Sequence, residues 1–584
     1  MKKIFIIAFA ALFTLASCSI LDTKPQAQIS PDDYFKTGND LLLFTNPLYD
    51  LFETAPYSKT DDHIVQKSLS TEMRGGILPS TVTGWSWGTL RRINALLANA
   101  DKCEDEEDRA YYVGLDRFFR AYFYFEKVKR FGDVPWIDHE LTSDSGELYA
   151  PRDSRDLVMG HMIEDVDAAI AVLTPSVSTY RVNKWAALAL KAQFCLFEGT
   201  WRQYHGEIEG AERTAADYLS LAAAAAKEIM DSGIYTLAPD YQTLFAESDA
   251  DQGEYILAIK RDVSLGLVTN TTAYATMSTQ GMPGFTKKFI DSFLMKDGTR
   301  FTDRAGWETM EFQEEMADRD PRLSASVVCP GYKRIGGTKV LAPDYTSSIT
   351  GYQLAKWVMD ETLPGVGRVS MSYNDIPVYR LGEIYLIYAE AVAELGTITQ
   401  NDLDISVNLL RDRVGMPHLN LEEANANPDP YLLSEEYGYR NVKAGANQGV
   451  ILEIRRERGV ELCAEGKRYD DIKRWKEGQC ITQALYGPYF PGEGKYDLSG
   501  NNIIDLILYS GDKPKNTGTA DVRKLGTLDG GLVLSGETSG YVDMITDQHP
   551  FNEERDYLMP IPTDDRNLNN NLTQNPGWDD GLKF

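Results

Sequence analysis

Apolar side chains recur every three or four residues through two long stretches of the chain, 31–235 and 376–480. That period places the apolar side chains on one face of each of a series of helices. The stripes that predict these helices lie at 90–97, 118–128, 163–173, 185–196, 219–230, 379–395 and 450–476. Ser30 and Pro31, followed by two aspartates, predict a helix start, because serine caps and proline tolerates the first turn.

Two of these helices form the clearest hairpin. The stretch 184–233 has an alanine-rich first helix, a polar break and an alanine-rich second helix. Small residues at packing positions in paired helices are typical of tetratricopeptide units, whose period is about 34 residues. The repeats are degenerate here, so the periodicity by itself supports only helical hairpins.

The pattern changes at 236–375 and again at 481–555, where glycine and loop-forming residues become frequent. A short strand is predicted at 255–260. The sequence therefore predicts a mainly α fold: a tetratricopeptide-like scaffold of helical hairpins with an irregular, loop-rich lobe that contains short strands. We expect 31–584 to form a single domain, with 31–235 and 376–480 as its scaffold.

The N-terminus has the layout of a secretory signal. Lys2 and Lys3 precede an apolar run, 4–15, which is shorter than the roughly 20 residues that span a bilayer. The run ends in LASC at 15–18, the pattern of a bacterial lipobox. We expect 1–17 to be a signal peptide, Cys18 to carry lipid and 18–30 to be a tether. The alternative is an ordinary signal peptide cut elsewhere, with Cys18 incidental.

Charge and composition exclude several classes of function. The formal net charge of −28 repels phosphate backbones, so no nucleic-acid partner is expected. Five cysteines remain after Cys18 at wide spacings, which is no disulfide framework, although one pair could bridge. The six histidines are scattered without H-E-x-x-H or C-x-x-C, so we expect no metal and no cofactor.

One short motif matches a nucleophile elbow. The sequence GWSWG at 84–88 fits G-x-S-x-G, and 78–83 could supply the preceding strand. A catalytic Ser86 is the minor reading, because two indoles would crowd it and the alternation of strands and helices is missing. The better reading is a loop-to-helix junction with one packed tryptophan and one free to stack on a ligand.

Aromatic residues in the predicted loops suit sugar rings, since C–H bonds pack on a π face while polar groups take the hydroxyls. The candidate ligand-binding residues, all in segments that read as loops, are Trp85, Arg74, Asp62, Trp307, Tyr332 and Trp357. The structural alternative is that these side chains fill the irregular lobe. The dense charges at 453–474 are read as a structural ion-pair network, because arginines exceed any catalytic need.

Several motifs, in this order, resemble the SusD/RagB family of surface nutrient-binding lipoproteins. They are RLGEIYLIYAEA at 380–391, RERGVELCAEG at 456–466, RYD at 468–470, RW at 474–475, Cys18 with LDTKP at 21–25, RFFRAY at 117–122 with FGDVP at 131–135, DRDPRL at 318–323, and MPIP at 559–562 with QNPGW at 574–578. Together they extend along the whole mature chain.

The resemblance implies a tetratricopeptide-based scaffold that binds oligosaccharides, or peptides in some members, at the outer face of an outer membrane. It implies a hinged lid over a SusC-like TonB-dependent transporter and no catalysed reaction. Members usually bind ligand in loops before the first long helix and in the variable lobe. That placement favours Trp85 for ligand contact, whereas Trp87 matches a packed scaffold tryptophan. Glycan capture is the first hypothesis, peptide capture the second and a serine hydrolase the third.

Overall fold

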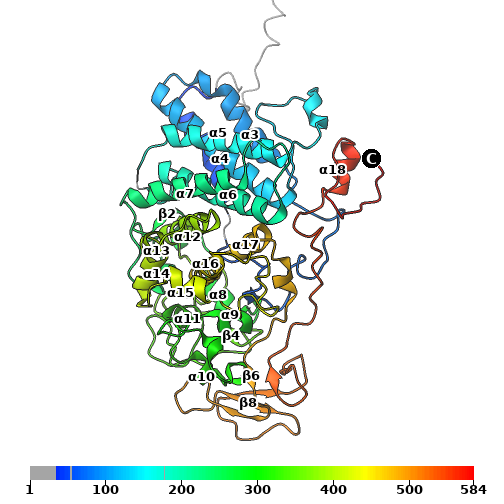
Figure 1. The fold of residues 1–584 in the computed structure, drawn as a ribbon. Coiled ribbons are helices and arrows are strands. Elements are labelled where there is room, and N and C mark those ends of the chain that lie inside the picture. The colour runs from blue at the N-terminus through cyan, green and yellow to red at the C-terminus, as the bar shows by residue number, and fades with distance from the viewer. Residues whose placement is uncertain (1–33, 53–54, 177) are drawn as a thin grey trace, which may run out of the picture.

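The computed structural model describes residues 34–52, 55–176 and 178–584 (Figure 1). The expected signal peptide, Cys18 with its expected lipid and the helix start predicted at Ser30 lie outside these residues. Within them, no helix is both long enough and apolar enough to cross a membrane.

The N-terminal helices form where the apolar stripes predict them. Their bounds are α2 Gly38–Thr45, α3 Gly88–Asn99, α4 Glu106–Phe131, α5 Arg155–Val172, α6 Lys184–His205 and α7 Ala215–Asp231. Polar caps define their starts: Asp105, Ser154 and Asn183 each accept backbone N–H bonds from the first turn of the helix that follows. Helix α4 ends at Gly132, whose φ of 73° favours glycine.

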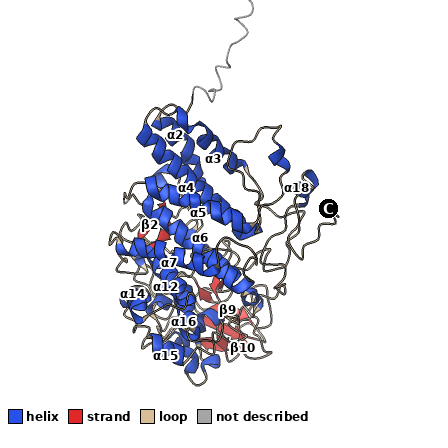
Figure 2. Ribbon diagram, turned by 45° about the horizontal axis from the view of Figure 1, so that its top comes forward, coloured by secondary structure: helices blue, strands red, loops and turns tan. Residues whose placement is uncertain are grey.

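The long helices stack in order. Helix α4 packs on α5, α5 on α6 and α6 on α7, and then α7 packs on α12 (Leu381–Glu394) and α12 on α16 (Gln448–Glu461). Helices dominate and strands are confined to small clusters (Figure 2). The predicted mainly α, tetratricopeptide-like fold is confirmed, and α6 and α7 are the hairpin expected at 184–233.

The stack continues from α7 to α12 although about 150 residues separate them in sequence. Strand β2 (Tyr255–Ile259) leaves the scaffold after α7, and β5 (Ile376–Arg380) returns to it before α12. These two strands pair antiparallel, with Tyr255 opposite Arg380, so the lobe between them begins and ends at one place. The lobe is thereby inserted without interrupting the scaffold.

The other strands are short. They are β1 Ile64–Val65, β3 Gly284–Phe285, β4 Tyr352–Gln353, β6 Tyr489–Phe490, β7 Gly494–Tyr496, β8 Leu506–Tyr509, β9 Asp521–Lys524 and β10 Gly540–Tyr541. They form the sheets β1-β3-β4 and β7-β8-β9 and the ribbon β10-β6, and only β8 and β9 run parallel. Strands β6 to β10 lie at the end of the molecule away from α3 to α5 (Figure 1).

The remaining helices are short and support the lobe or close the chain. They are α8 Thr271–Thr276, α9 Lys287–Ser292, α10 Phe312–Met316, α11 Pro321–Ser326, α13 Gln400–Asp404, α14 Val407–Val414, α15 Leu421–Ala426, α17 Arg468–Arg474 and α18 Thr563–Leu568.

The single helix predicted at 450–476 is in fact two helices, α16 and α17. Ala464 and Gly466 between them have φ angles of 57° and 74°, which no α-helix accommodates. The break lets Glu465 reach the guanidinium of Arg380 at 2.7 Å and the Lys356 ammonium at 2.7 Å. Ion pairing between segments outweighs local helix propensity here.

The charges of α16 and α17 are buried in ion pairs, as the network reading expects. Arg458 pairs with Asp471 at 2.8 Å, and Arg411 pairs with Glu457 at 2.6 Å. Arg474 pairs with Glu390 of α12. The five cysteines after Cys18 are buried free thiols, so no pair among them bridges.

Candidate functional site

Four half-buried aromatic rings gather where the ribbon β10-β6 meets the 3₁₀ turn Trp307–Thr309. We call this set, Trp307, Tyr486, Tyr489 and Tyr541, the aromatic surface. Tyr541 and Tyr489 face each other in the ribbon, with ring centroids 6.0 Å apart. Tyr541 also stacks on Tyr486, with centroids 5.2 Å apart and planes 26° apart.

Lys287, at the start of α9, holds the aromatic surface together from below. Its Nζ lies 5.9 Å from the centroid of the Trp307 ring and 5.5 Å from that of Tyr541, so one ammonium contacts both. Its backbone N–H donates to the carbonyl of Tyr486 at 2.7 Å. The aromatic residues of two distant segments are thus fixed relative to one another.

The charge of Lys287 is neutralised underneath. Its Nζ lies 2.6 Å from Glu315 and 3.1 Å from Asp291. Burial alone would lower the pKa of Lys287, but these two carboxylates raise it above its ordinary value. Lys287 is therefore ion-paired and brings no unpaired positive charge to the aromatic surface.

Trp307 is braced from behind by two further rings. Tyr431 packs edge-on against it with centroids 5.4 Å apart, and Phe301 does so at 6.3 Å. Gly306, with a φ of 76°, makes the turn that presents the indole. A braced and half-exposed indole is preorganised for stacking, since little side-chain entropy is lost on binding.

Three carboxylates border the rings. Burial is the main cause that raises the pKa of Tyr541 and of Tyr486. At Tyr541 Lys287 lowers the pKa while Glu436 and Glu308 raise it, and at Tyr486 Asp543 raises it further. Partial burial also raises the pKa of Glu436 and of Asp543. Exposed ring area beside carboxylate acceptors suits a ligand with apolar C–H faces and hydroxyl donors.

The burial of Trp85 and Trp87 is the reverse of the expectation. Trp85 is only 7% exposed and packs edge-on against Phe131 and Trp87, at 4.9 and 5.3 Å. Trp87 is the half-buried indole, with Lys127 Nζ over its ring at 5.4 Å. Gly84, with a φ of 96°, turns the chain so that Trp85 folds inward against the end of α4. The edge of Trp85 still lines a shallow hollow beside Pro562.

Asp62 and Trp357 do not stand in open loops, which corrects the expectation. Asp62 is fully buried and contacts Arg468 Nε at 2.7 Å and Lys288 Nζ at 2.6 Å. Burial alone would raise the pKa of Asp62, but these cations hold it below its ordinary value. Trp357 is 1% exposed, and its indole N–H donates to the carbonyl of Ala464 at 2.9 Å.

The other candidates have different surroundings. Trp307 belongs to the aromatic surface. Arg74 is exposed in a turn whose neighbour Gly75 abuts the ring of His549, at the far end of the extended segment that begins at Tyr541. Tyr332 is half-buried in the 330s loop, where burial raises its pKa to about 12. The structure therefore does not bring the six candidates into one cluster.

The motif around Ser86 lacks the setting of a nucleophile elbow. Residues 79–81 form a turn, and 78–83 contains no strand of the kind that a nucleophile elbow would need before it. Gly84 serves the scaffold, because its carbonyl accepts the Lys127 ammonium and a Cβ there would lie 2.9 Å from Arg130 Nε. Ser86 is exposed beside Pro562, Asp564 and Asp565 in a hollow whose lining contains no histidine.

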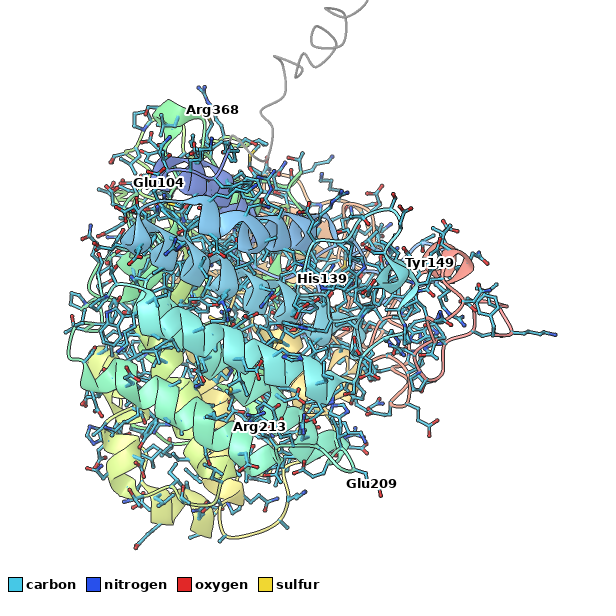
Figure 3. The ribbon with its side chains drawn as sticks, turned by 90° about the horizontal axis from the view of Figure 1, so that it is seen from above. Glu104, His139, Tyr149, Glu209, Arg213 and Arg368 are labelled. Atoms are coloured by element: carbon cyan, nitrogen blue, oxygen red, sulfur yellow. The ribbon has the colours of Figure 1, made fainter. Side chains whose placement is uncertain are left out.

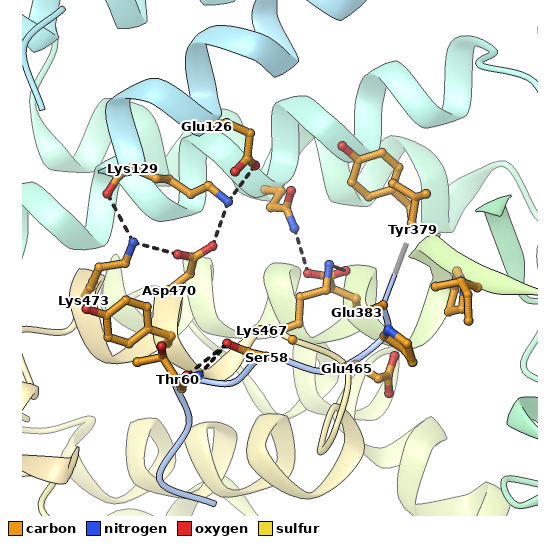
Figure 4. A pocket seen from close by; sticks show the side chains of 18 of the residues that line it. Ser58, Thr60, Glu126, Lys129, Tyr379, Glu383, Glu465, Lys467, Asp470 and Lys473 are labelled. Carbon is orange, nitrogen blue, oxygen red and sulfur yellow. Dashed lines mark hydrogen bonds and ion pairs between the residues drawn. The ribbon is translucent and has the colours of Figure 1, made fainter. Parts of the chain in front are cut away.

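A second candidate is a cavity of about 330 Å³ between α4, α12 and α17 (Figure 4). Its walls are charged, but the charges pair across it. Lys129 contacts Asp470 at 2.8 Å, Asp470 contacts Lys473 at 2.9 Å, and Lys467 contacts Glu383 at 2.9 Å. Asp470 and Lys473 both lie on α17, but the Lys129–Asp470 and Lys467–Glu383 pairs join α4 and α12 to the α17 segment, so ion pairs cross-link the scaffold around this cavity.

Among the described residues, no group of three or more histidine, cysteine or acidic side chains is placed to hold a metal ion. Of the two candidates, the aromatic surface offers half-exposed rings, whereas the charged residues of the cavity pair with one another. Sequence reasoning missed Tyr486, Tyr489 and Tyr541. Their signal was present as YGPYFPG at 486–492, aromatic residues among turn formers in a glycine-rich insert.

Comparison with known proteins gives consistent matches. The model of the SusD family matches residues 251–578. SusD-like protein P2 of Formosa agariphila is 24% identical over 562 residues, which cover 89% of this chain and all of that protein. SusD-like protein P38 of the same organism is 22% identical over 516 residues, which cover 82% of this chain and 92% of that protein.

Solved structures match over nearly the whole chain. A SusD-like carbohydrate binding protein from Bacteroides fragilis superposes with a TM-score of 0.68 at 22% identity, covering 92% of this chain and 99% of that one. A laminarin binding SusD-like protein gives a TM-score of 0.54 at 17% identity, covering 93% of this chain and all of that one. Similarity at this level of identity shows a shared fold.

Proposed function

Because the chain belongs to the SusD family, we propose that it is a cell-surface lipoprotein that captures oligosaccharides and passes them to a SusC-like TonB-dependent transporter. In this proposal the protein catalyses no reaction. Lipid on Cys18 holds it at the outer face of the outer membrane, and 18–30 lets it move as a lid. Fractionation tests the anchor, since Cys18→Ser should release the protein from membranes with its ligand affinity intact.

The aromatic surface is the observation that supports glycan capture. Trp307 is braced by Tyr431 and shares Lys287 with Tyr541, so two ring systems from distant segments border one area. Such rings can stack on many different sugars, and carboxylates beside them can accept hydrogen bonds from sugar hydroxyl groups. Two structural neighbours, named as carbohydrate binding and laminarin binding, support the same ligand class.

Peptide capture is the alternative within the same architecture. A peptide would be held by backbone hydrogen bonds, as at a sheet edge, more than by stacked rings. Glycan arrays and peptide mixtures probed with the same protein separate these two ligand classes. The proposal expects retention of glycans.

The test compares Trp307→Ala and Tyr541→Ala with the matched control Tyr149→Ala. Tyr149 is 59% exposed and lies on the side of the molecule near α18 (Figure 3). Calorimetric titration with the best array ligand should show affinity lowered by at least about fivefold in the first two variants, because one stacked ring contributes about 1–3 kcal/mol. The control should bind as the wild type does. Equal affinity in all four proteins would reject the site.

Trp85→Ala and Trp357→Ala are poor tests of this site. Both indoles are packed in the interior, so truncation would leave cavities and destabilise the protein by about 3–5 kcal/mol. Loss of binding in either variant would reflect the fold. The half-exposed rings of the aromatic surface avoid this ambiguity.

A further inference from the structure

The rings of the aromatic surface fall into two groups. Trp307 packs against Tyr431, whereas Tyr541 packs against Tyr486 and Tyr489. In the part of the chain that the structure describes, no ring–ring contact joins Trp307 to the tyrosines of the aromatic surface. Direct stacking therefore does not set the distance between the indole and these tyrosines.

The first turn of α9 joins the two groups instead. One atom, Lys287 Nζ, lies 5.9 Å from the centroid of Trp307 and 5.5 Å from that of Tyr541, so these centroids are at most about 11 Å apart. The carbonyl of the next residue, Lys288, accepts a hydrogen bond of 3.0 Å from the hydroxyl of Tyr431. Adjacent residues at the start of one helix therefore hold both groups of rings.

The ammonium of Lys287 is itself held in place by buried groups. It lies 2.6 Å from Glu315 and 3.1 Å from Asp291, and Glu315 also accepts hydrogen bonds of 2.8 and 2.9 Å from the hydroxyl of Tyr352. All four side chains are at most 3% exposed. Lys287 is therefore too buried to contact a ligand on the surface, and its cation is fixed beside the faces of both rings.

We infer that Lys287 is a positioning residue that makes the two groups of rings one binding site for a single sugar chain. This inference rests on the proposed function and names its ligand class, which is chains long enough to lie on Trp307 and on the tyrosines at once. A fragment that covers one group gains nothing from the spacing between the groups. A longer chain that stacks on the first group brings its next rings to the second without a further loss of translational freedom.

The benefit of chain length depends on how firmly the spacing is fixed. Binding at the second group is intramolecular once the first group is occupied, and it is lost if the geometry forbids both contacts at once. We expect the wild type to bind a spanning chain at least about fivefold more tightly than a fragment that covers one group. Without the cation, this advantage should fall to about twofold or less, because the two groups can then shift independently.

The variant K287M/D291N/E315Q removes the cation together with its two anions and leaves every ring in place. Removing the three charges at once avoids the unpaired buried carboxylates that Lys287→Met alone would create. Any change in ligand binding then reports on the spacing of the rings and not on the loss of a ring.

The matched control K356M/E465Q removes a second buried ammonium that also lies beside an aromatic face. Lys356 Nζ lies 3.9 Å from the centroid of Phe245 and 2.7 Å from Glu465. Arg380, which also contacts Glu465, keeps its 2.8 Å contact with Glu461. None of the residues that Lys356 contacts belongs to the aromatic surface.

The experiment is calorimetric titration of the full chain with a size series of the best array glycan, from its monosaccharide upward. In the wild type, affinity should rise with length until the chain spans both groups and then level off. K287M/D291N/E315Q should bind the shortest measurable fragment within about twofold of the wild type and lose most of the gain with length. K356M/E465Q should keep the wild-type ratio of long-chain to short-fragment affinity.

The outcomes distinguish this inference from the proposed function. If K287M/D291N/E315Q keeps the gain with length, loses short-fragment and long-chain affinity alike, or behaves as the control does, the positioning role is wrong even where Trp307→Ala still weakens binding. If no glycan binds in a Trp307-dependent way, the proposed function is wrong as well. A thermal melt checks that each variant folds, and Lys287→Gln, whose amide can still donate to Glu315, gives the same comparison should the triple variant fold poorly.

Discussion

Replacing Asp62 by asparagine tests whether this residue supports the fold or contacts a ligand. Its carboxylate is fully buried and lies within 2.6–3.0 Å of nitrogens on Lys288 and Arg468. Asparagine has the same shape but no charge, so Asp62→Asn leaves two buried cations without their anion. Breaking a buried pair in this way costs about 3–5 kcal/mol.

Other contacts of the two cations set the expected value within that range. Arg468 keeps a 2.7 Å bond to the Tyr439 hydroxyl, and Lys288 keeps a 2.5 Å bond to the carbonyl of Cys480. These neutral acceptors stabilise the cations in part, so we expect Asp62→Asn to lower the free energy of unfolding by about 3 kcal/mol. That is a large fraction of the roughly 5–15 kcal/mol typical of a domain.

Urea unfolding at neutral pH measures the difference, with Asp144→Asn as the control. Asp144 is exposed, so its variant should stay within about 0.5 kcal/mol of the wild type. The Asp62 pKa is depressed in the folded state, so the stabilisation is fully present above the unfolded pKa of about 3.9. It is lost as the pH falls from there through the folded pKa. A loss below about 1 kcal/mol at neutral pH, accompanied by loss of ligand binding, would refute the structural assignment.

Two further predictions concern the backbone and the pH dependence of stability. Gly84→Ala should lower the melting temperature, because φ at this residue is 96° and the new Cβ would lie 2.9 Å from Arg130 Nε. Gly88→Ala is the control: nothing lies within 4 Å of its new Cβ, so the melting temperature should stay unchanged or rise slightly. Equal losses in both glycine variants would contradict this account of G-x-S-x-G. Burial raises the pKa of Glu477 to about 7, although Arg455 lies 3.4 Å away. Because the unfolded chain loses this proton near pH 4.5 and the folded protein only near pH 7, the wild type should lose up to about 3 kcal/mol of stability as the pH rises across this range. Glu477→Gln should flatten that slope in unfolding experiments across this range, and an identical slope would show that the carboxyl titrates normally.

The helical scaffold could be predicted from the sequence because its signals are local. Apolar stripes and caps such as Asn183 and Thr214 define α6 and α7 without reference to the rest of the chain. The break between α16 and α17 could not be predicted, since it depends on Glu465 reaching Arg380, 85 residues earlier. Local helix propensity favours one continuous helix, but the ion pair between Glu465 and Arg380 requires a break that divides it into α16 and α17.

The candidate site was less predictable than the fold for the same reason. Trp307 was identified because an indole in a loop is a local signal. Its partners Tyr486 and Tyr541 come from a distant insert and meet it only through Lys287 and the β10-β6 ribbon. The inward turn of Trp85 depends on the backbone at Gly84, which sequence alone does not give.

The central claim, that ligand lies on the aromatic surface, is tested most directly by hydroxyl-radical footprinting of the unmodified protein with and without the best array glycan. This account predicts that bound glycan protects Trp307, Tyr486 and Tyr541 from oxidation and leaves the exposed Tyr149 as reactive as before. Protection at other residues, with these three rings equally reactive in both samples, would contradict it.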